Sequence, residues 1–295
     1  AASGAGILGE VTIKDSRGAT KSAPINAVTG AYSADVSGMN GPFVLRAKGT
    51  VGGRQVQYHS YATDADIDAT INITPFTDLI FANVVQQLAS SYFDSITVSG
   101  PPPASITTAD IEIQEAALQA KLQAVLNALG VGSAIDLLHT PFSANRSGLD
   151  AVLDVVLISP DPSAPTTAVL IENLIDKTQL ADAFNDPDDN SETLTVTSSS
   201  TVYSTQAKDR QAISQLFADI TLLFASGLPS ANQVTAKLTT DFLNQDKSGA
   251  QFAAELSTDP SLRGQVFSGL EIGETETDGT RKVKFQLVFS GLINT

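Results

Sequence analysis

The hydrophobic pattern of the chain changes its period near residue 73, and this change limits the folds that the sequence can adopt. Before that point apolar and polar residues alternate in short runs, such as residues 8–14 and 31–36, and Gly-rich turns separate the runs. Alternation predicts strands with one buried face, and short strands at this spacing are typical of a β-sandwich. We therefore expect an antiparallel β-sandwich over residues 1–73.

A helical period follows from residue 74 onward. Thr74 supplies an N-cap with Pro75 in the first turn, and apolar residues then recur three or four positions apart. A second N-cap signal at Thr107 starts another amphipathic run, which Gly130 ends. Residues 74–190 are thus predicted as a mainly helical middle region. Its last residues are acidic and rich in turn formers, as expected of a seam between domains.

The last region, residues 191–295, mixes both periods. Alternation over residues 193–203 predicts a strand, and an apolar stripe over residues 208–225 predicts a helix. Two shorter helices are expected, over residues 230–242 and residues 250–256.

A hairpin is predicted close to the C-terminus. Residues 266–274 and 281–289 flank the dipeptide Asp278-Gly279, which favours the tight turn of a β-hairpin. With the preceding helices, this hairpin predicts a C-terminal α+β unit. The whole chain is therefore expected to be multidomain: a β-sandwich, a central helical region and an α+β unit.

Three motifs occur in a fixed order in the first region. They are Gly9-x-Val11-x-Ile13-x-Asp15-x-x-Gly18, Thr29-Gly30-Ala31-Tyr32-Ser33 and Pro42-Phe43-Val44-Leu45-x-Ala47-x-Gly49. In this order they resemble the carboxypeptidase regulatory-like (transthyretin-like) domain. The resemblance implies a seven-stranded sandwich that acts as a spacer, adhesive or docking module and has no catalytic residues.

Two elements of the middle region look like the segments that follow such a sandwich in bacterial secreted lipoproteins. They are Thr74-Pro75-Phe76-Thr77-Asp78-Leu79-Ile80 and Gly148-Leu149-Asp150-x-Val152-Leu153-Asp154. The C-terminal order of a long helix, shorter helices and a hairpin, with residues 241–249, resembles the nuclear-transport-factor-like cone fold. That fold normally has a further strand pair. The unit is therefore truncated, belongs to a longer sequence, or is completed by a strand from a neighbouring chain.

Charge and composition exclude several classes of function. Lys and Arg total 17 against 32 Asp and Glu, and the net charge of -15 repels a phosphate backbone, so nucleic acid is not expected as a partner. The chain has no Cys, which excludes disulfides, thiolate metal sites and cysteine nucleophiles.

The first residues, Ala1-Ala2-Ser3-Gly4, are small, as in the stub that remains after a secretory signal is removed. We expect a secreted protein of the periplasm, the outer-membrane surface or the extracellular space. No apolar run approaches the length of a membrane-spanning helix, about 20 residues. Membrane attachment would then need a lipid anchor upstream of residue 1 or a partner.

Candidate chemistry is sparse. His59 and His139 are the only histidines, and each is predicted to be a turn or surface residue, not a member of a metal pair or a catalytic triad. The sequence has no Gly-x-Ser-x-Gly elbow, phosphate-binding Gly-rich loop or His-Glu-x-x-His motif. We predict no catalytic, cofactor-binding or metal-binding residues, no cofactor, and no enzyme activity.

Two acidic segments leave calcium binding open. Asn244, Asp246 and Glu255 fall on positions one, three and twelve of a helix-loop-helix calcium site, although a helix-capping turn explains the same residues. Asp186 and Asp188 belong to the second segment, for which a solvated linker is the alternative.

The function expected from these patterns is that of a non-catalytic structural or interaction protein of the cell envelope or extracellular space. Its expected partners are proteins, including further copies of itself in a homo-oligomer, a surface filament, a sheath or a complex. The alternative is a ligand carrier or enzyme that uses a pocket in the C-terminal cone-like unit.

Overall fold

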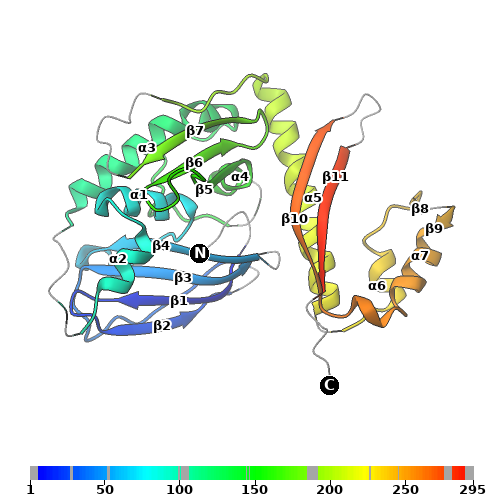
Figure 1. Cartoon of the computed structure of the whole chain (residues 1–295), viewed down its shortest axis with the longest axis horizontal. Coiled ribbons are helices and arrows are strands. Elements are labelled where there is room, and N and C mark those ends of the chain that lie inside the picture. The colour runs from blue at the N-terminus through cyan, green and yellow to red at the C-terminus, as the bar shows by residue number, and fades with distance from the viewer. Residues whose placement is uncertain are drawn as a thin grey trace. The chain divides into compact units, whose positions relative to one another are not determined.

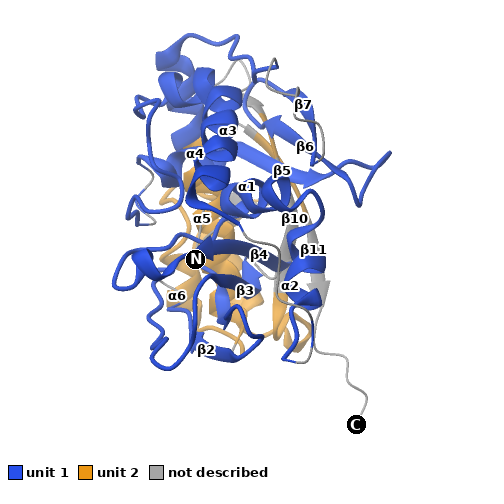
Figure 2. Ribbon diagram, turned by 90° about the vertical axis from the view of Figure 1, so that its left-hand side faces the viewer, with its two compact units in different colours: residues 1–51, 55–208 blue, residues 52–54, 209–295 orange. Residues whose placement is uncertain are grey.

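The computed structural model describes residues 6–26, 29–51, 54–98, 100, 106–143, 145, 147–184, 192–225, 227–244, 246–275 and 281–289. The chain forms two compact units, coloured separately in Figure 2. Unit 1 comprises residues 1–51 and 55–208, and unit 2 comprises residues 52–54 and 209–295. The domain limits predicted at residues 73 and 190 stay predictions.

Unit 1 begins with a four-stranded antiparallel sheet. Its strands are β1 (Leu8–Lys14), β2 (Thr20–Pro24), β3 (Phe43–Val51) and β4 (Arg54–Ala62), in the order β2-β1-β3-β4 (Figure 1). Val11 in β1 lies opposite Ala23 of β2 and Ala47 of β3, and all three side chains are buried. The predicted antiparallel strands are confirmed here, with alternate residues of β1 on one buried face.

The second layer of the expected sandwich does not occur among the described residues of this region. No other sheet packs on the face that carries Ile13 and Leu45; residues 31–36 cover that face without a ladder partner. Their prediction as a strand was wrong, because alternation reports which side chains are buried and not whether the backbone pairs. Tyr32, Ala34 and Val36 still pack against the sheet.

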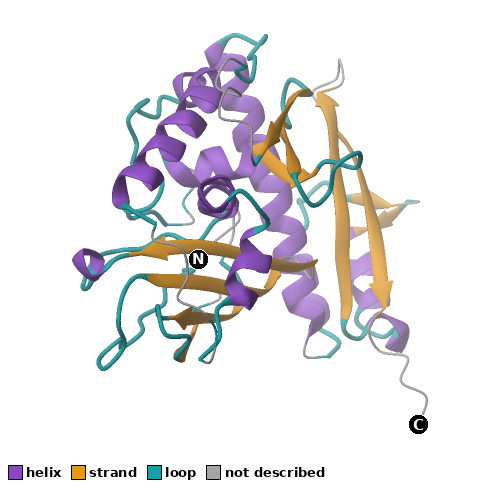
Figure 3. Ribbon diagram, turned by 60° about the vertical axis from the view of Figure 1, so that its left-hand side comes forward, coloured by secondary structure: helices purple, strands orange, loops and turns teal. Residues whose placement is uncertain are grey.

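Helices cover the opposite face of the sheet (Figure 3). They are α1 (Pro75–Val85), α2 (Ala89–Ser95), α3 (Thr108–Ala128) and α4 (Leu149–Val155). Thr74 and Thr107 cap α1 and α3 through capping boxes, as predicted. Gln86 ends α1 in the left-handed conformation, with φ at 54°.

The middle region also contains a sheet that the sequence did not predict. Its strands are β5 (Val156–Pro160), β6 (Ala168–Asn173) and β7 (Thr178–Ala183), antiparallel in the order β5-β6-β7. The prediction of a mainly helical region was wrong over these residues. Most of the Pro-rich segment 159–165 connects β5 to β6, because Pro initiates turns between paired strands.

One apolar core joins these elements, and α1 lies between the two sheets (Figure 1). The core includes Tyr61 from β4, Phe76 from α1 and Ile171 from β6. A buried ion pair lies within unit 1: Lys121 Nζ of α3 is 2.8 Å from Asp182 Oδ1 of β7, and each side chain is 4% exposed.

Helix α5 (Ser200–Ala225) contains the limit between the two units. It begins before the predicted residue 208, so the strand predicted over residues 193–203 was wrong. Ser, Thr and Val favour strands only weakly, and tertiary contacts override such preferences. Here the buried Tyr203 donates from Oη to Asn173 Oδ1 at 2.8 Å.

Unit 2 continues with short elements and ends in a hairpin. They are α6 (Ala231–Thr235), β8 (Leu243–Asn244), β9 (Lys247–Ser248), α7 (Gly249–Leu256), β10 (Gln265–Thr275) and β11 (Arg281–Phe289). The antiparallel pairing of β10 with β11 is confirmed, while their predicted turn at Asp278-Gly279 lies outside the described residues. Helix α7 is also confirmed, but α6 is shorter than predicted. None of the described helices has the length and apolar content that crossing a membrane requires.

Candidate functional site

A cavity of about 530 Å³ lies over the sheet face that carries Ile13 and Leu45. Residues 29–34, 66–72 and 141–143 form its walls, and Phe43 adds to its floor. Known small-molecule sites have volumes of about 300–1,000 Å³, so the cavity has the size of a ligand site. It occupies the side of the sheet on which the expected second strand layer is missing.

The first two walls are bonded to each other. Tyr32 Oη donates a hydrogen bond to the backbone oxygen of Ile71 at 2.7 Å. Burial raises the pKa of the Tyr32 phenol, so the hydroxyl stays protonated and remains a donor at neutral pH. This bond holds residues 29–34 against residues 66–72.

Asn72 connects the second wall to the third. Its side chain is buried, and Nδ2 donates to the oxygens of Leu137 at 3.1 Å and Thr140 at 2.9 Å. Its backbone N–H donates to Leu138 O at 2.7 Å. The turn that precedes residues 141–143 is therefore fixed by one asparagine from a distant part of the chain.

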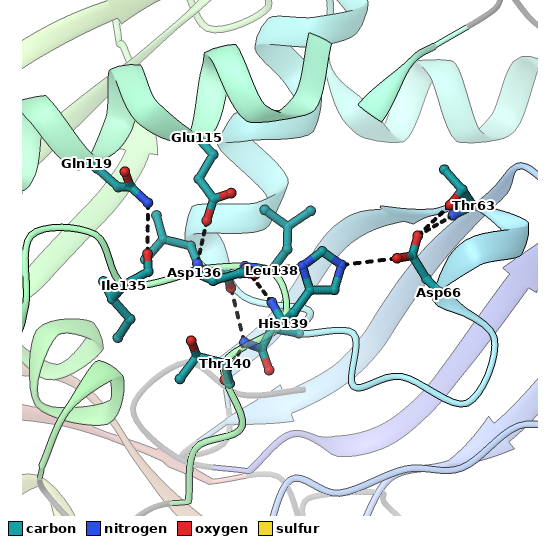
Figure 4. A network of polar contacts seen from close by, with 11 residues as sticks. Thr63, Asp66, Glu115, Gln119, Ile135, Asp136, Leu138, His139 and Thr140 are labelled. Carbon is teal, nitrogen blue, oxygen red and sulfur yellow. Dashed lines mark hydrogen bonds and ion pairs between the residues drawn. The ribbon is translucent and has the colours of Figure 1, made fainter. Parts of the chain in front are cut away.

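A network of polar contacts extends from the same turn to the cavity wall (Figure 4). His139 Nδ1 lies 2.9 Å from Asp136 Oδ2, and Nε2 lies 3.5 Å from Asp66 Oδ1. Asp66 Oδ2 accepts from Thr63 N at 2.6 Å and from Thr63 Oγ1 at 2.8 Å. Asp66 thus belongs both to this network and to the cavity lining.

Helix α3 supports the turn from its other side (Figure 4). Glu115 Oε1 accepts the N–H of Leu137, and Gln119 Nε2 donates to Ile135 O at 2.8 Å. Burial raises the pKa of Glu115 above its ordinary value, and the nearby charge of Asp136 acts in the same direction. The hydrogen bond from Leu137 opposes this shift without reversing it.

The cavity lining combines two acids with aromatic rings. Asp66 and Asp68 are its ionisable acids, and Tyr32, Phe43 and Phe142 are its aromatic residues. The described lining contains no Lys, Arg or His. Since His139 does not line the cavity, the ionisable side chains that a bound molecule would meet in the described lining are the carboxylates of Asp66 and Asp68 and the phenol of Tyr32.

The prediction that His59 is a turn or surface residue was wrong. His59 lies on β4, is 1% exposed, and its Nδ1 is 2.7 Å from Asp78 Oδ1. The pattern of β4 places His59 on the face opposite Val56 and Tyr58, but a pattern cannot reveal that helices bury this face too. His139 does lie in a turn and is partly exposed, as predicted.

The candidate calcium loop is a hairpin followed by a helix. Helix α7 starts at Gly249, so half of the loop is helical and cannot wrap around an ion. Ser248 caps α7 by accepting from Gln251 N, and Lys247 Nζ binds Glu255 Oε2 at 2.7 Å. The helix-capping alternative is confirmed.

The second acidic segment, with Asp186 and Asp188, lies outside the described residues. Within the described part of the chain, no group of three or more His, Asp or Glu side chains is arranged to hold a metal ion.

Unit 2 exposes large apolar side chains. Leu216 and Leu222 on α5 and Phe285 on β11 are all exposed, and the Phe285 ring centroid lies 5.0 Å from that of Phe217. The residues that the structure describes as buried and apolar in this unit are Phe224, Val234, Ala253 and Ile272. Large apolar side chains that are exposed on a folded unit are available for contact with another molecule.

Comparisons with family models, with curated proteins and with solved structures found no match to this chain. The resemblances to a carboxypeptidase regulatory-like domain and to a nuclear-transport-factor-like fold therefore stay predictions from the sequence motifs.

Proposed function

We propose that this chain is a non-catalytic interaction protein of the cell envelope or extracellular space, and that unit 2 binds a second copy of the chain. One observation carries the proposal: within the described residues, β10 and β11 pair only with each other. Each strand of a two-stranded sheet has one edge that faces its neighbour and one edge that faces away from it. Such an edge is a template for a strand from another chain.

The exposed apolar side chains of unit 2 support the same proposal. A two-stranded hairpin is marginally stable by itself, and three or more strands, or packing against a helix, are needed for independent stability. Helix α5 supplies one such contact through Phe217 and Phe285. Additional strands from a second copy would cover more of the exposed apolar surface and stabilise the hairpin.

The sequence of β11 fits pairing with its own copy. Apolar residues alternate along the strand at Val283, Phe285 and Leu287. Two β11 strands related by a two-fold axis pair antiparallel and keep Val283 and Phe285 on one face of a four-stranded sheet. This face is the one on which Phe285 contacts α5. We also propose, from the sequence motifs alone, that residues 1–73 are related to the carboxypeptidase regulatory-like sandwich and that residues 191–295 are related to the nuclear-transport-factor-like cone fold.

Hydrogen exchange of the full chain tests self-association directly. We expect amides of β11 to become more protected as protein concentration rises, while sedimentation velocity reports a dimer. Strand β2 is a matched internal control, because it is also an edge strand but lies in unit 1. Protection that is independent of concentration in both strands, with a monomer at every concentration, would contradict the proposal.

A pair of variants distinguishes specific pairing through β11 from nonspecific hydrophobic association. Phe285→Glu introduces a charge on the β11 face and should abolish the dimer. Ile113→Glu makes the same type of change at an exposed apolar residue of α3 in unit 1 and should leave the dimer intact. Equal effects of the two variants would argue against a β11 interface.

The cavity of unit 1 favours a second candidate function, ligand binding. Its three walls are tied together by Tyr32 and Asn72, so it is held open by the fold and does not depend on a loose loop. It differs from the pocket expected in the C-terminal region, because all its lining residues belong to unit 1. A ligand that binds the folded chain raises its unfolding temperature, so a thermal-shift series over small molecules tests this function.

A further inference from the structure

We infer that the cavity of unit 1 binds an alkylammonium group, either on a free amine or on a lysine side chain. The inference rests on the ligand-binding function proposed for this cavity and adds the chemical class of its ligand. It is carried by the joint presence of carboxylates, aromatic rings and an apolar floor in one cavity.

The charge of the lining selects a cation. Asp66 and Asp68 line the wall, and the described lining residues include no basic side chain to neutralise them. His139 lies outside the lining, and its Nε2 is 3.5 Å from Asp66 Oδ1. Asp66 supplies one negative charge to the wall, and the exposed Asp68 supplies the second. An anionic ligand would be repelled by both carboxylates.

The aromatic residues add a second preference for a cation. Tyr32, Phe43 and Phe142 contribute to the lining, and the face of an aromatic ring attracts an ammonium group within about 6 Å of its centre. The hydroxyl of Tyr32 donates to Ile71 O, so the phenol is held where the first two walls of the cavity meet. Unit 1 itself uses such contacts: Lys14 Nζ lies 4.4 Å from the ring centroid of Phe93.

The floor of the cavity suits the rest of the ligand. Ile13 and Leu45 present apolar side chains from the sheet, and both are buried within the same cluster as Phe43. Ile13 and Leu45 are already buried, whereas Ile67 and Phe142 line the cavity and keep exposed apolar surface. An alkyl chain gains free energy by covering this surface while its charged end stays near polar groups. The ligand is therefore a chain of several methylene groups that ends in an ammonium.

Three matched probes test the inference by isothermal titration calorimetry on the full chain: pentylammonium, 1-pentanol and pentanoate. They share the alkyl chain and differ in charge. We expect pentylammonium to bind at least about tenfold more tightly than 1-pentanol, a difference of about 1.4 kcal/mol. Pentanoate should bind most weakly. Nα-acetyl-lysine N-methylamide is the fourth probe, and its binding would identify a lysine side chain as the source of the ammonium.

Two variants locate the site. Asp68→Asn removes one charge from the wall, and Asn tolerates the positive φ of 68° at this position. We expect it to weaken pentylammonium binding several-fold. Asp161→Asn is the control, because it makes the same charge change at a partly exposed residue between β5 and β6, away from the cavity lining. It should leave the affinity unchanged.

The results distinguish two claims: that the cavity binds a ligand, and that this ligand carries an alkylammonium group. If 1-pentanol binds as tightly as pentylammonium, the ligand class is wrong while ligand binding by the cavity stands. If Asp68→Asn and Asp161→Asn have equal effects, the ammonium does not bind at this wall and the inference is overturned. If none of the four probes binds, both the ligand class and the ligand-binding function of the cavity are contradicted.

Discussion

The Asp78 carboxylate in the first turn of α1 binds His59 of β4 twice, through the backbone N–H at 2.8 Å and ring Nδ1 at 2.7 Å. Thr77 Oγ1 also donates to the backbone oxygen of His59 at 2.8 Å. The beginning of α1 is therefore bonded to one residue of the sheet. These contacts set the position of the helix that lies between the two sheets of unit 1.

Loss of the Asp78 carboxylate should destabilise unit 1. In Asp78→Ala the buried donors of His59 lose their acceptor, and we expect unfolding free energy to fall by about 1–3 kcal/mol. Asp78→Asn keeps one oxygen and should lose less. Urea unfolding followed by circular dichroism measures the change. Asp94→Ala is the control, because Asp94 is exposed and pairs with Arg46 at the surface; a loss as large as that of Asp78→Ala would contradict this role of Asp78.

Breaking the buried ion pair of Lys121 and Asp182 should cost more. Lys121→Met leaves the Asp182 carboxylate buried beside Asn83, whose Nδ2 donates to it at 3.1 Å, and removal of one partner of a buried pair costs about 3–5 kcal/mol. The double variant Lys121→Met with Asp182→Leu removes both charges and should recover part of this loss. A double-mutant cycle in urea gives the coupling free energy. Additive single effects would show that the two side chains do not stabilise each other.

Glu115 should make the unfolding free energy of the chain fall as pH rises. Burial and Asp136 raise its pKa in the folded state, so the folded chain binds more protons than the unfolded chain above the ordinary pKa of Glu. The stability contribution of this group is complete below that ordinary pKa and is lost as pH rises through the folded-state value. Glu115→Gln keeps an oxygen for the Leu137 N–H and removes the titration.

The unfolding free energies of Glu115→Gln and of the unchanged protein, measured from pH 4 to pH 7, test this sign. The variant should gain stability relative to the unchanged protein as pH rises. Glu112→Gln, on the same helix, is a matched control that lacks the contact with Leu137. If the variant instead loses stability relative to the unchanged protein as pH rises, the direction of the pKa shift of Glu115 is contradicted.

The sequence predicted the elements whose causes are local. Thr74 and Thr107 cap helices because a threonine hydroxyl reaches the N–H groups of the next turn, whatever the rest of the chain does. The C-terminal hairpin was predicted from its turn dipeptide and from the alternating segments beside it. Helix α7 likewise begins at its own cap, Ser248.

The elements that the sequence missed depend on distant parts of the chain. Residues 31–36 alternate like a strand but pack on the sheet without pairing, and α5 extends back to Tyr203, which Asn173 binds. The cavity has walls from three separate segments, and Asn72 and Tyr32 join them through bonds to backbone oxygens. Any residue can supply a backbone oxygen, so no sequence motif marks such a site.

Asp15 should stabilise the first turn of the chain at neutral pH. It is 1% exposed, and its carboxylate accepts from Arg17 N at 2.9 Å, Ala19 N at 2.8 Å and Asn40 N at 3.0 Å. Burial alone would raise the pKa of Asp15, but the hydrogen bonds from Asn40, Arg17 and Ala19 outweigh it and hold the pKa below its ordinary value. The stability contribution is therefore present above the unfolded-state pKa and is lost as pH falls through the folded-state value.

Asp15→Asn keeps the size of the side chain but removes its charge and one acceptor oxygen, so we expect a loss of about 1–3 kcal/mol in unfolding free energy at pH 7. The loss should become smaller as pH falls toward 3, because Asp15 in the unchanged protein then becomes neutral as well. Urea unfolding at both pH values measures the two differences. Asp161→Asn is again the control, since the carboxylate of Asp161 accepts from Ser163 and from the backbone N–H of Ala164, within a single turn between β5 and β6. A loss for Asp15→Asn that is the same at both pH values would mean that the shape of the side chain, and not its charge, stabilises this turn.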